Sequence, residues 1–314
     1  MELDFEKPLQ VIRDEIAALD QKRMKGDSVA SSRIATLRRK LKSETAKIYS
    51  QLSPWDTVQV ARHPGRPTVM DYAGKMCDEF IELHGDRLFG DDKAIIGGFA
   101  QIDSTRFMLI GHRKGRNVDE NISSNFGMGN PEGYRKAMRL MHLAAKFGVP
   151  VVTLVDTPGA YPGLEAEARG QAEAIARNLT EMAVLETPIL TIVTGEGGSG
   201  GALGIAVGDR VLMLENAVYS VISPEGCASI LWRDGSQAPT AAAALKITSR
   251  DLAALGIVDG IIPEPVGGAH SNPDETMANV KAAVLEQLKA LRSFSTSRLL
   301  DNRYKKYAAM GRYN

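Results

Sequence analysis

The chain has 314 residues, 44% of them hydrophobic and 24% charged, and its 38 basic side chains balance 38 acidic ones. These proportions fit a large globular protein of one or two domains, and the zero net charge provides no overall field that would favour nucleic acid or an anionic membrane. The first ten residues, MELDFEKPLQ, lack the apolar core of a signal peptide, and no apolar run is long enough to span a bilayer. Cys77 and Cys227 lie far apart, which fits a reducing cytoplasm. Each is expected to be a small buried residue, and no metal site can be built from cysteine alone.

Residues 1–62 are expected to form a helical arm. Two apolar series with steps of three and four residues predict two amphipathic helices, paired as an antiparallel hairpin across the polar segment KRMKGDSVASS. The series are Phe5, Leu9, Ile12, Ile16 and Leu19, and then Ile34, Leu37, Leu41 and Ile48. The narrow stripe that each series forms needs a partner surface, in this chain or in another. The segment HPGRPT, residues 63–68, is typical of a linker and ends the arm.

An α/β domain is expected over residues 63–292, and a C-terminal helix and tail over 293–314. Strands are predicted in AIIGGFAQI, FMLIGH, VVTLVD, PILTIVT, RVLML, AVYSVIS and IVDGII. Helices are predicted in NPEGYRKAMRLMHLAAKFGVP, EAEARGQAEAIARNLTEMAVLE, PEGCASILW, DLAAL and DETMANVKAAVLEQLKALRSF. The first of these should have Asn130 as its N-cap, Pro131 at its first position and Gly148 just past its end. The basic, aromatic segment DNRYKKYAAMGRYN is expected to be a short helix and tail on a neighbouring surface.

The segment TIVTGEGGSGGALGIAVGD, residues 191–209, fits three functional motifs. Its glycines follow the dinucleotide-binding pattern G-x-G-x-x-G, and Glu215 lies where an acid that binds ribose would be. Against this interpretation, Gly208 ends the following helix after about eight residues, which is too short for a strand-crossover helix. A phosphate-binding P-loop is excluded because no lysine follows the glycines.

The same segment contains G-x-S-x-G, the pattern of a hydrolase nucleophile elbow, with Ser199 as the nucleophile. His270 and Asp259 would have to complete a catalytic triad, but no second feature supports His270 in that role. The alternative is that Ser199 caps a helix that begins at Gly200.

The third interpretation is a backbone oxyanion site at Gly200 and Gly201. Without a Cβ over the backbone, a ligand oxygen can approach the free amides at a helix start, where the helix dipole also favours negative charge. Small residues further along, Ala202, Gly204 and Ala206, keep this helix thin. A glycine-rich turn that serves only tight packing remains the alternative.

A second small-residue turn favours the oxyanion interpretation. VDTPGAYPG, residues 155–163, follows the preceding buried strand and leads into a helix, so two successive strands end in such turns on the side where α/β proteins bind ligands. The polar loop of residues 115–134 is long enough to reach over that side. No paired carboxylates, metal cluster or convincing base are evident, and Glu165 and Glu167 are expected to form the solvated start of a helix. The pattern indicates stabilisation of an oxyanion, with the proton handled by the substrate or by a partner.

Several long blocks in this order resemble the carboxyltransferase alpha subunit of multi-subunit bacterial acetyl-CoA carboxylase, over essentially the whole chain. They are DDKAIIGGFA, GHRKGR, NFGMGNPEGYRKAMRLM, DTPGAYPG, ARGQAEAIARNL, GEGGSGGALG, VYSVISPEGCASILW and IIPEPVGGAH. The resemblance implies an α/β, crotonase-like (ClpP/crotonase) fold of repeated ββα units. It also implies an alpha2-beta2 enzyme in the cytoplasm, which makes malonyl-CoA for fatty acid biosynthesis at a site between unlike subunits.

The resemblance also implies the cofactors and partners. Carboxybiotin arrives on a biotin carboxyl carrier protein and is charged by a biotin carboxylase that consumes ATP, and zinc is expected only on the beta subunit. In the family the matching glycine pair, here Gly200 and Gly201, supplies the oxyanion hole for the biotin ureido oxygen. Biotin's own nitrogen then takes the methyl proton of acetyl-CoA, so no protein base is needed.

Further site residues follow from the matching motifs. Expected to bind substrate are Gly159, Ala160, Tyr161, Gly198, Ala202, Phe126 and Gly127. In GHRKGR, His112, Arg113, Lys114 and Arg116 would meet CoA phosphates or the acidic surface of the carrier, or else form a solvated cationic loop. One departure is GGALGIAVG, where the family pattern is GGALAIGVG; Gly204 is expected to loosen the first turn of the helix slightly.

Two other functions remain open from the residues alone. One is a stand-alone crotonase-like hydratase or hydrolase of an acyl-CoA, which would need an acid/base carboxylate such as Glu165 or Glu167. The other is a non-catalytic scaffold that holds the beta subunit.

Overall fold

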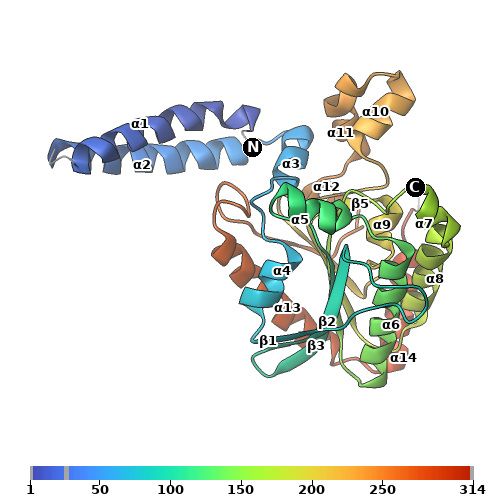
Figure 1. Cartoon of the computed structure of the whole chain (residues 1–314). Helices are drawn as coiled ribbons and strands as arrows, with labels where there is room; N and C mark the ends of the chain where they lie inside the picture. Colours follow the sequence, from blue (N-terminus) through green and yellow to red (C-terminus); the bar gives the residue numbers. More distant parts are fainter. Residues whose placement is uncertain (1–2, 25–27, 312–314) are drawn as a thin grey trace.

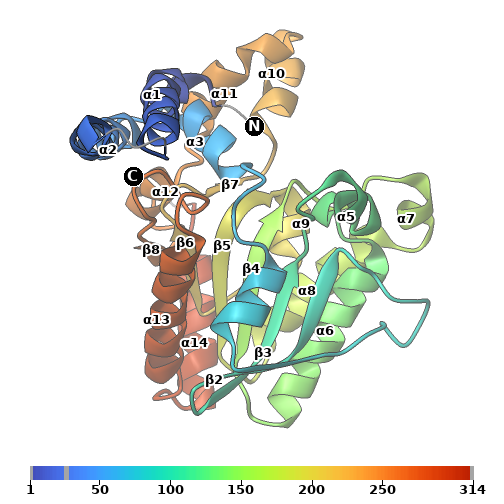
Figure 2. The same ribbon diagram turned by 60° about the vertical axis from the view of Figure 1, so that its left-hand side comes forward.

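An eight-stranded mixed sheet forms the centre of the body (Figure 1, Figure 2). The computed structural model describes residues 3–24 and 28–311. Strand order is β1-β2-β3-β4-β5-β6-β8, and β7 pairs with the end of β5. The pairs β1–β2 and β2–β3 are antiparallel and all the others are parallel. The strands are β1 (Glu79–Glu82), β2 (Ile95–Ile102), β3 (Thr105–His112), β4 (Val151–Thr157), β5 (Ile189–Gly198), β6 (Arg210–Leu214), β7 (Val218–Ser220) and β8 (Gly260–Ile262).

Helices precede, connect and follow these strands. Before the sheet are η1 (Asp4–Glu6), α1 (Lys7–Met24), α2 (Ser28–Tyr49), α3 (Pro54–Ala61), α4 (Val69–Asp71) and η2 (Tyr72–Met76). Between strands are α5 (Val118–Ser123), η3 (Asn125–Gly127), α6 (Pro131–Lys146), α7 (Leu164–Ala168), α8 (Gln171–Val184), α9 (Ser199–Leu203), α10 (Pro224–Trp232), η4 (Gly235–Gln237), α11 (Ala238–Leu245) and α12 (Ser249–Ala254). After the last strand come α13 (Pro273–Leu291) and α14 (Thr296–Ala308).

The two central strands explain the layered arrangement. β4 and β5 are buried along almost their whole length, and their sequences are mostly apolar without strict alternation, as is usual for parallel strands covered on both faces. Helices α6 and α8 pack on each other along one face, and α13 lies on the opposite side of the sheet (Figure 1). The carboxyl ends of β4 and β5 are therefore neighbours at one edge, which is where ligands bind in open parallel sheets.

The predicted hairpin is present as α1 and α2, which project from the body (Figure 1). Leu9 and Ile12 of α1 and Ile34 and Leu37 of α2 are buried, because the two apolar stripes face each other. Part of the polar segment between the helices, residues 25–27, lies outside the described residues.

The predicted strands and the helix α6 are confirmed, although only Val218–Ser220 of AVYSVIS and Gly260–Ile262 of IVDGII are strand residues. Pro131 is the first residue of α6, Asn130 is its N-cap residue, and Gly148 follows its end with a φ of +65°. The Asn130 side chain makes no capping hydrogen bond, so only its position was predictable.

Three local predictions are wrong. Gly170, with a φ of +85°, divides the expected helix over residues 165–186 into α7 and α8. The expected polar loop 115–134 contains the short helices α5 and η3. Helices α3 and α11 were not predicted, and α3 packs on α11 and β7. Cys77 and Cys227 are half-buried rather than fully buried, and burial raises the pKa of the Cys77 thiol to about 11.

Candidate active site

The two predicted small-residue turns meet at the carboxyl edge of the sheet. β4 and β5 pair in parallel up to Thr157 and Gly197, so the turns that follow them leave the sheet side by side. A Cβ on Gly198 would overlap the carbonyl of Pro158, and a Cβ on Gly201 would overlap the backbone of Gly159 and Ala160. Glycine is therefore required at 198 and 201 by the approach of one turn to the other.

The close approach of the two turns gives a different reason for glycine at position 201 from the one that the sequence suggests, which was access of a ligand oxygen to the amides. A side chain there would collide with the neighbouring turn and would not simply cover the amides. Gly200 differs, because a Cβ there would meet only Ile175 at 3.8 Å, an ordinary van der Waals distance. The amides of Gly200 and Gly201 lie in the first turn of α9, and neither donates a hydrogen bond to any other residue that the structure describes. The edge of the sheet thus presents two adjacent backbone donors.

Helix α9 is shorter than predicted, and Ser199 does not cap it. The helix spans Ser199–Leu203, its N-cap residue is Gly198, and the Ser199 side chain makes no capping hydrogen bond. Ser199 has a φ of +50°, in the left-handed region, because the chain reverses sharply from β5 into α9. Gly204 lies at the end of α9 rather than in its first turn, and a Cβ there would lie 2.6 Å from the ring of Tyr134. The glycine at this departure from the family pattern therefore accommodates that ring.

A cluster of charged side chains lies beside the turns. The Lys114 ammonium is 2.7 Å from Oδ1 of Asp156 and 3.8 Å from Oε2 of Glu196. The amide of Glu196 donates to Oδ1 of Asp156 at 3.0 Å, and Arg62 bridges Glu196 to Glu225. Each of these carboxylates therefore has a cationic partner.

Three of these charged residues, Arg62, Lys114 and Asp156, line a cavity of about 250 Å³. Its lining includes Lys114, Phe126, Asp156 and Pro158, together with residues of the segment 61–68. Phe126 is half-exposed with a φ of +55°, and Gly127 beside it has a φ of +76° and lies against the carbonyl of Asp156. The segment that contains η3 thus places Phe126 and Gly127 next to the turn that follows β4.

The remaining predicted residues of the first turn are also at this edge. Gly159, Ala160 and Tyr161 are half-buried, and the Tyr161 amide donates to the carbonyl of Gly129 at 3.1 Å. Gln171 donates to the carbonyl of Tyr161 at 2.9 Å, so the turn is held from α8. Ala202 is fully buried, and contact of its side chain with a ligand is not possible in this conformation.

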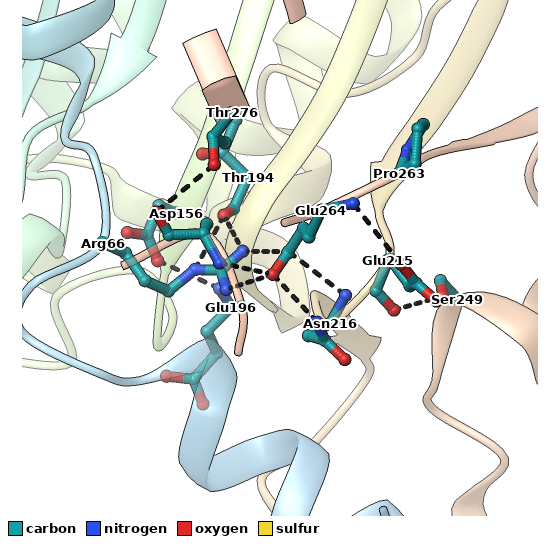
Figure 3. A network of polar contacts seen from close by, with 12 residues as sticks. Arg66, Asp156, Thr194, Glu196, Glu215, Asn216, Ser249, Pro263, Glu264 and Thr276 are labelled. Carbon is teal, nitrogen blue, oxygen red and sulfur yellow. Dashed lines mark hydrogen bonds and ion pairs between the residues drawn. The ribbon is translucent and has the colours of Figure 1, made fainter. Parts of the chain in front are cut away.

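A buried ion pair anchors the segment 63–68 to the same edge. Figure 3 shows the Arg66 guanidinium facing the Glu264 carboxylate, with Nη2 2.6 Å from Oε1. Arg66 also donates to the carbonyl of Thr194 in β5, and Glu264 accepts from Asn216 and Ala269. Burial raises the pKa of Glu264, but the Arg66 charge and these hydrogen bonds outweigh it, and the net pKa is below the ordinary value. The predicted linker is therefore fixed to the sheet.

The GHRKGR segment is divided between the interior and the surface. His112 is 1% exposed, so its predicted contact with CoA phosphates or a carrier protein is wrong. Burial lowers the pKa of His112 to about 4, against the opposite effects of the Asp156 carboxylate and the Gly201 carbonyl. Neither ring nitrogen makes a hydrogen bond of good geometry with the described residues. Lys114 forms its ion pairs within the charge cluster, and the exposed Arg116 pairs with Asp71. The half-buried Arg113 forms no ion pair within the described part of the chain.

The competing motifs do not assemble. His270 stacks on His63 with ring centroids 3.8 Å apart, and Asp259 pairs with Lys306 and Arg210. No hydrogen bond joins either residue to Ser199 in the part of the chain that the structure covers, so the triad is not formed. Glu215 pairs with Arg250, and α9 is far shorter than the helix of a dinucleotide-binding unit. Glu165 is exposed in α7, as predicted.

Sequence reasoning missed the charge cluster and the buried ion pair. Asp156 was within reach, because it directly precedes the TPG turn at the end of a buried strand. Arg62, Arg66 and Glu264 come from segments about 130 to 200 positions away from their partners, and no local signal connects them.

Three or more His, Cys, Asp or Glu side chains grouped to hold a metal ion do not occur among the described residues, and none of the described helices is long and apolar enough to cross a membrane.

The mixed sheet with two glycine turns at one edge has the crotonase-like architecture of acyl-CoA carboxyltransferases. The transcarboxylase 12S core with hydrolysed methylmalonyl-coenzyme A bound has a TM-score of 0.59 over 76% of this chain and 44% of that chain, at 20% identity. A Pseudomonas malonate decarboxylase hetero-tetramer in complex with coenzyme A has a TM-score of 0.57 over 70% of this chain and 89% of that chain, at 16% identity. These similarities show the fold.

Sequence comparison identifies the family. The model of the family described as acetyl co-enzyme A carboxylase carboxyltransferase-like matches residues 2–311. The acetyl-coenzyme A carboxylase carboxyl transferase subunit alpha of Geobacter metallireducens is 52% identical over 99% of this chain and 98% of its own length. That of Thermus thermophilus is 50% identical over 100% and 99%. The chain belongs to the family of acetyl-CoA carboxylase carboxyltransferase alpha subunits.

Proposed function

We propose that this chain is the alpha subunit of a carboxyltransferase that moves the carboxyl group from carboxybiotin to acetyl-CoA and forms malonyl-CoA. Two observations support the proposal together. The chain matches alpha subunits of that name at 50–52% identity over nearly its full length. Its sheet edge presents the adjacent amides of Gly200 and Gly201 without an internal acceptor among the described residues. The second observation carries the chemistry, because such donors stabilise negative charge on oxygen.

In this proposal the amides of Gly200 and Gly201 bind the ureido oxygen of biotin while it carries negative charge. Carboxybiotin itself supplies the carboxyl group, and its ureido nitrogen supplies the base. The chain's own contribution is rigid placement of the donors, which needs no reorganisation during the reaction and contributes about 3 kcal/mol per donor to lowering the barrier. The close contact of Gly201 with the turn at Gly159 supports such rigidity. Phe126 and Tyr161, beside the two turns, are proposed to bound the space that the biotin ring occupies.

A partner is required because the described residues supply only part of such a site. The carboxylates at the sheet edge are already paired with Lys114 and Arg62, which makes them poor bases. We therefore place the binding of acetyl-CoA mainly on a beta subunit, which also carries the zinc, in an alpha2-beta2 assembly. A biotin carboxyl carrier protein and an ATP-dependent biotin carboxylase complete the proposed pathway to malonyl-CoA for fatty acid biosynthesis, in the cytoplasm.

The test is a carboxyl-transfer assay in the reverse direction, from malonyl-CoA to a free biotin analogue. The purified chain alone should show negligible transfer, and co-purification with a co-expressed beta subunit should restore it. Full activity of the isolated chain would support a stand-alone acyl-CoA enzyme instead. Activity of the complex that survives disruption of α9 would support a scaffold role.

A further inference from the structure

Helix α9 depends on other parts of the fold for its shape. It has only five residues, and a helix of that length is not stable on its own. In a continuing α-helix, the Gly201 carbonyl would accept from the amide of Ile205. That amide instead donates to the carbonyl of Ala202 at 3.2 Å, so the Gly201 carbonyl accepts no hydrogen bond inside the helix.

A buried tyrosine of α6 satisfies this carbonyl. The hydroxyl of Tyr134, a residue with no exposed surface, donates to the Gly201 carbonyl at 3.2 Å. A trans peptide is planar, and its C=O and N–H point in opposite directions. The contact therefore also fixes the direction of the amide in the same peptide, which belongs to Ala202.

A buried asparagine of α8 holds the other end of α9. Nδ2 of Asn178 donates to the carbonyls of Gly204 and Tyr134, each at 2.9 Å, and Asn178 is 1% exposed. The amide of Gly204 in turn donates to the carbonyl of Gly200 at 2.9 Å. By the same planarity, that bond directs the amide of Gly201 the opposite way, toward the open edge of the sheet.

We propose that Tyr134 and Asn178 are positioning residues that hold α9 so that the amides of Gly200 and Gly201 are oriented for oxyanion binding. Tyr134 fixes the peptide that joins Gly201 to Ala202, directly after the Gly201 amide. Asn178 holds Gly204, whose amide bonds to the carbonyl of the peptide that contains the Gly201 amide. This inference rests on the proposed function, since it assumes that these amides hold the ureido oxygen.

The test compares two tyrosines in the assembled alpha–beta complex. Tyr134→Phe removes only the hydroxyl that contacts Gly201. Tyr72→Phe is the matched control, because Tyr72 is equally buried and its hydroxyl has no hydrogen-bond partner among the described residues. Transfer from malonyl-CoA to a biotin analogue is measured with the thermal unfolding temperature of each complex.

Tyr134→Phe should lower kcat about tenfold while the KM for malonyl-CoA stays within twofold, because donors are misdirected without loss of the CoA site. Tyr72→Phe should keep wild-type kcat and KM. Asn178→Ser, whose shorter side chain cannot reach both carbonyls, should lower kcat in the same way. A Tyr134→Phe complex with unchanged kcat, or an equal fall in both tyrosine variants, would overturn the inference. Failure of the wild-type complex to transfer carboxyl groups would instead count against the proposed function.

Discussion

Gly201 and Gly159 lie backbone to backbone across the two turns, close enough that a Cβ on Gly201 would overlap the carbonyl carbon of Gly159. Gly200, the preceding residue, has room for a Cβ at 3.8 Å from Ile175. Two identical neighbours in the sequence are thus under different constraints, one from the fold and one from the ligand that we propose.

This difference predicts opposite outcomes for two alanine variants. Gly201→Ala should lower the free energy of unfolding by about 3 kcal/mol, because the added methyl group forces the two turns apart. Gly200→Ala should lower it by less than about 1 kcal/mol, the ordinary cost of a fitting substitution. Urea unfolding of both variants measures this. Equal stability of the two would show that the turns separate easily and that Gly201 is not held by packing.

The buried ion pair of Arg66 and Glu264 predicts that one nearly isosteric substitution lowers the free energy of unfolding substantially. Glu264→Gln leaves the Arg66 charge buried without a counter-charge and should cost about 3 to 5 kcal/mol of unfolding free energy. The exposed pair of Glu15 and Arg33 provides the control, because Glu15→Gln should cost less than about 1 kcal/mol. If the two glutamine variants unfold at the same urea concentration, the buried pair contributes no more than a surface pair.

The same carboxylate gives a prediction for acidic pH. The folded pKa of Glu264 is below its ordinary value of 4.5, so the folded state binds fewer protons than the unfolded state in this range. Its contribution is complete above about pH 4.5 and is lost as the pH falls through the lower folded value. The wild type should therefore lose more stability than Glu264→Gln on acidification from pH 5, as followed by circular dichroism. Parallel curves would contradict the assignment.

His112 makes stability depend on pH in a higher range. Its folded pKa is about 4 against an ordinary 6.5, so the unfolded state takes up the extra proton and stability falls as the pH drops from 6.5 toward 4. His112→Leu removes this titration. Between pH 7 and about pH 4.5 the wild type should lose about 2 to 3 kcal/mol more than the variant in urea unfolding. A wild-type loss that matches the variant would mean that His112 is solvated or already charged.

Ser199 is expected to matter for backbone conformation rather than through its hydroxyl. Its side chain makes no capping bond, so Ser199→Ala should change the free energy of unfolding by less than about 0.5 kcal/mol and leave carboxyl transfer intact. Ser199→Gly should raise stability by about 1 kcal/mol, because φ is +50°. Complete loss of turnover in a folded Ser199→Ala protein would restore the hydrolase interpretation.

The sequence predicts those features that depend on local pattern. The apolar series of the hairpin, the buried runs of β4 and β5 and the two glycine turns each carry their own signal, and the structure confirms them. It also confirms that the turns lie together, because parallel neighbouring strands place their carboxyl ends at one edge.

What the sequence does not predict depends on partners that are distant along the chain. The charge cluster forms because three strand ends converge and bring together Lys114, Asp156 and Glu196. None of the three segments carries a sequence pattern that indicates contact with the other two. Ser199 was expected to cap because serine is common at that position, but the sharp reversal after β5 moves the cap to Gly198. Local preference was overruled there by the geometry of the connection.

The projecting hairpin affects how the molecule moves through solution. The 22 residues of α2 extend about 33 Å, a reach comparable to the diameter of a small domain. Because the hairpin projects from one side of the body (Figure 1), the molecule has a larger frictional coefficient than a sphere of equal mass and tumbles anisotropically. Removal of α1 and α2 should therefore reduce the Stokes radius by more than the lost mass alone implies. A partner that binds the hairpin also constrains the orientation of the sheet edge.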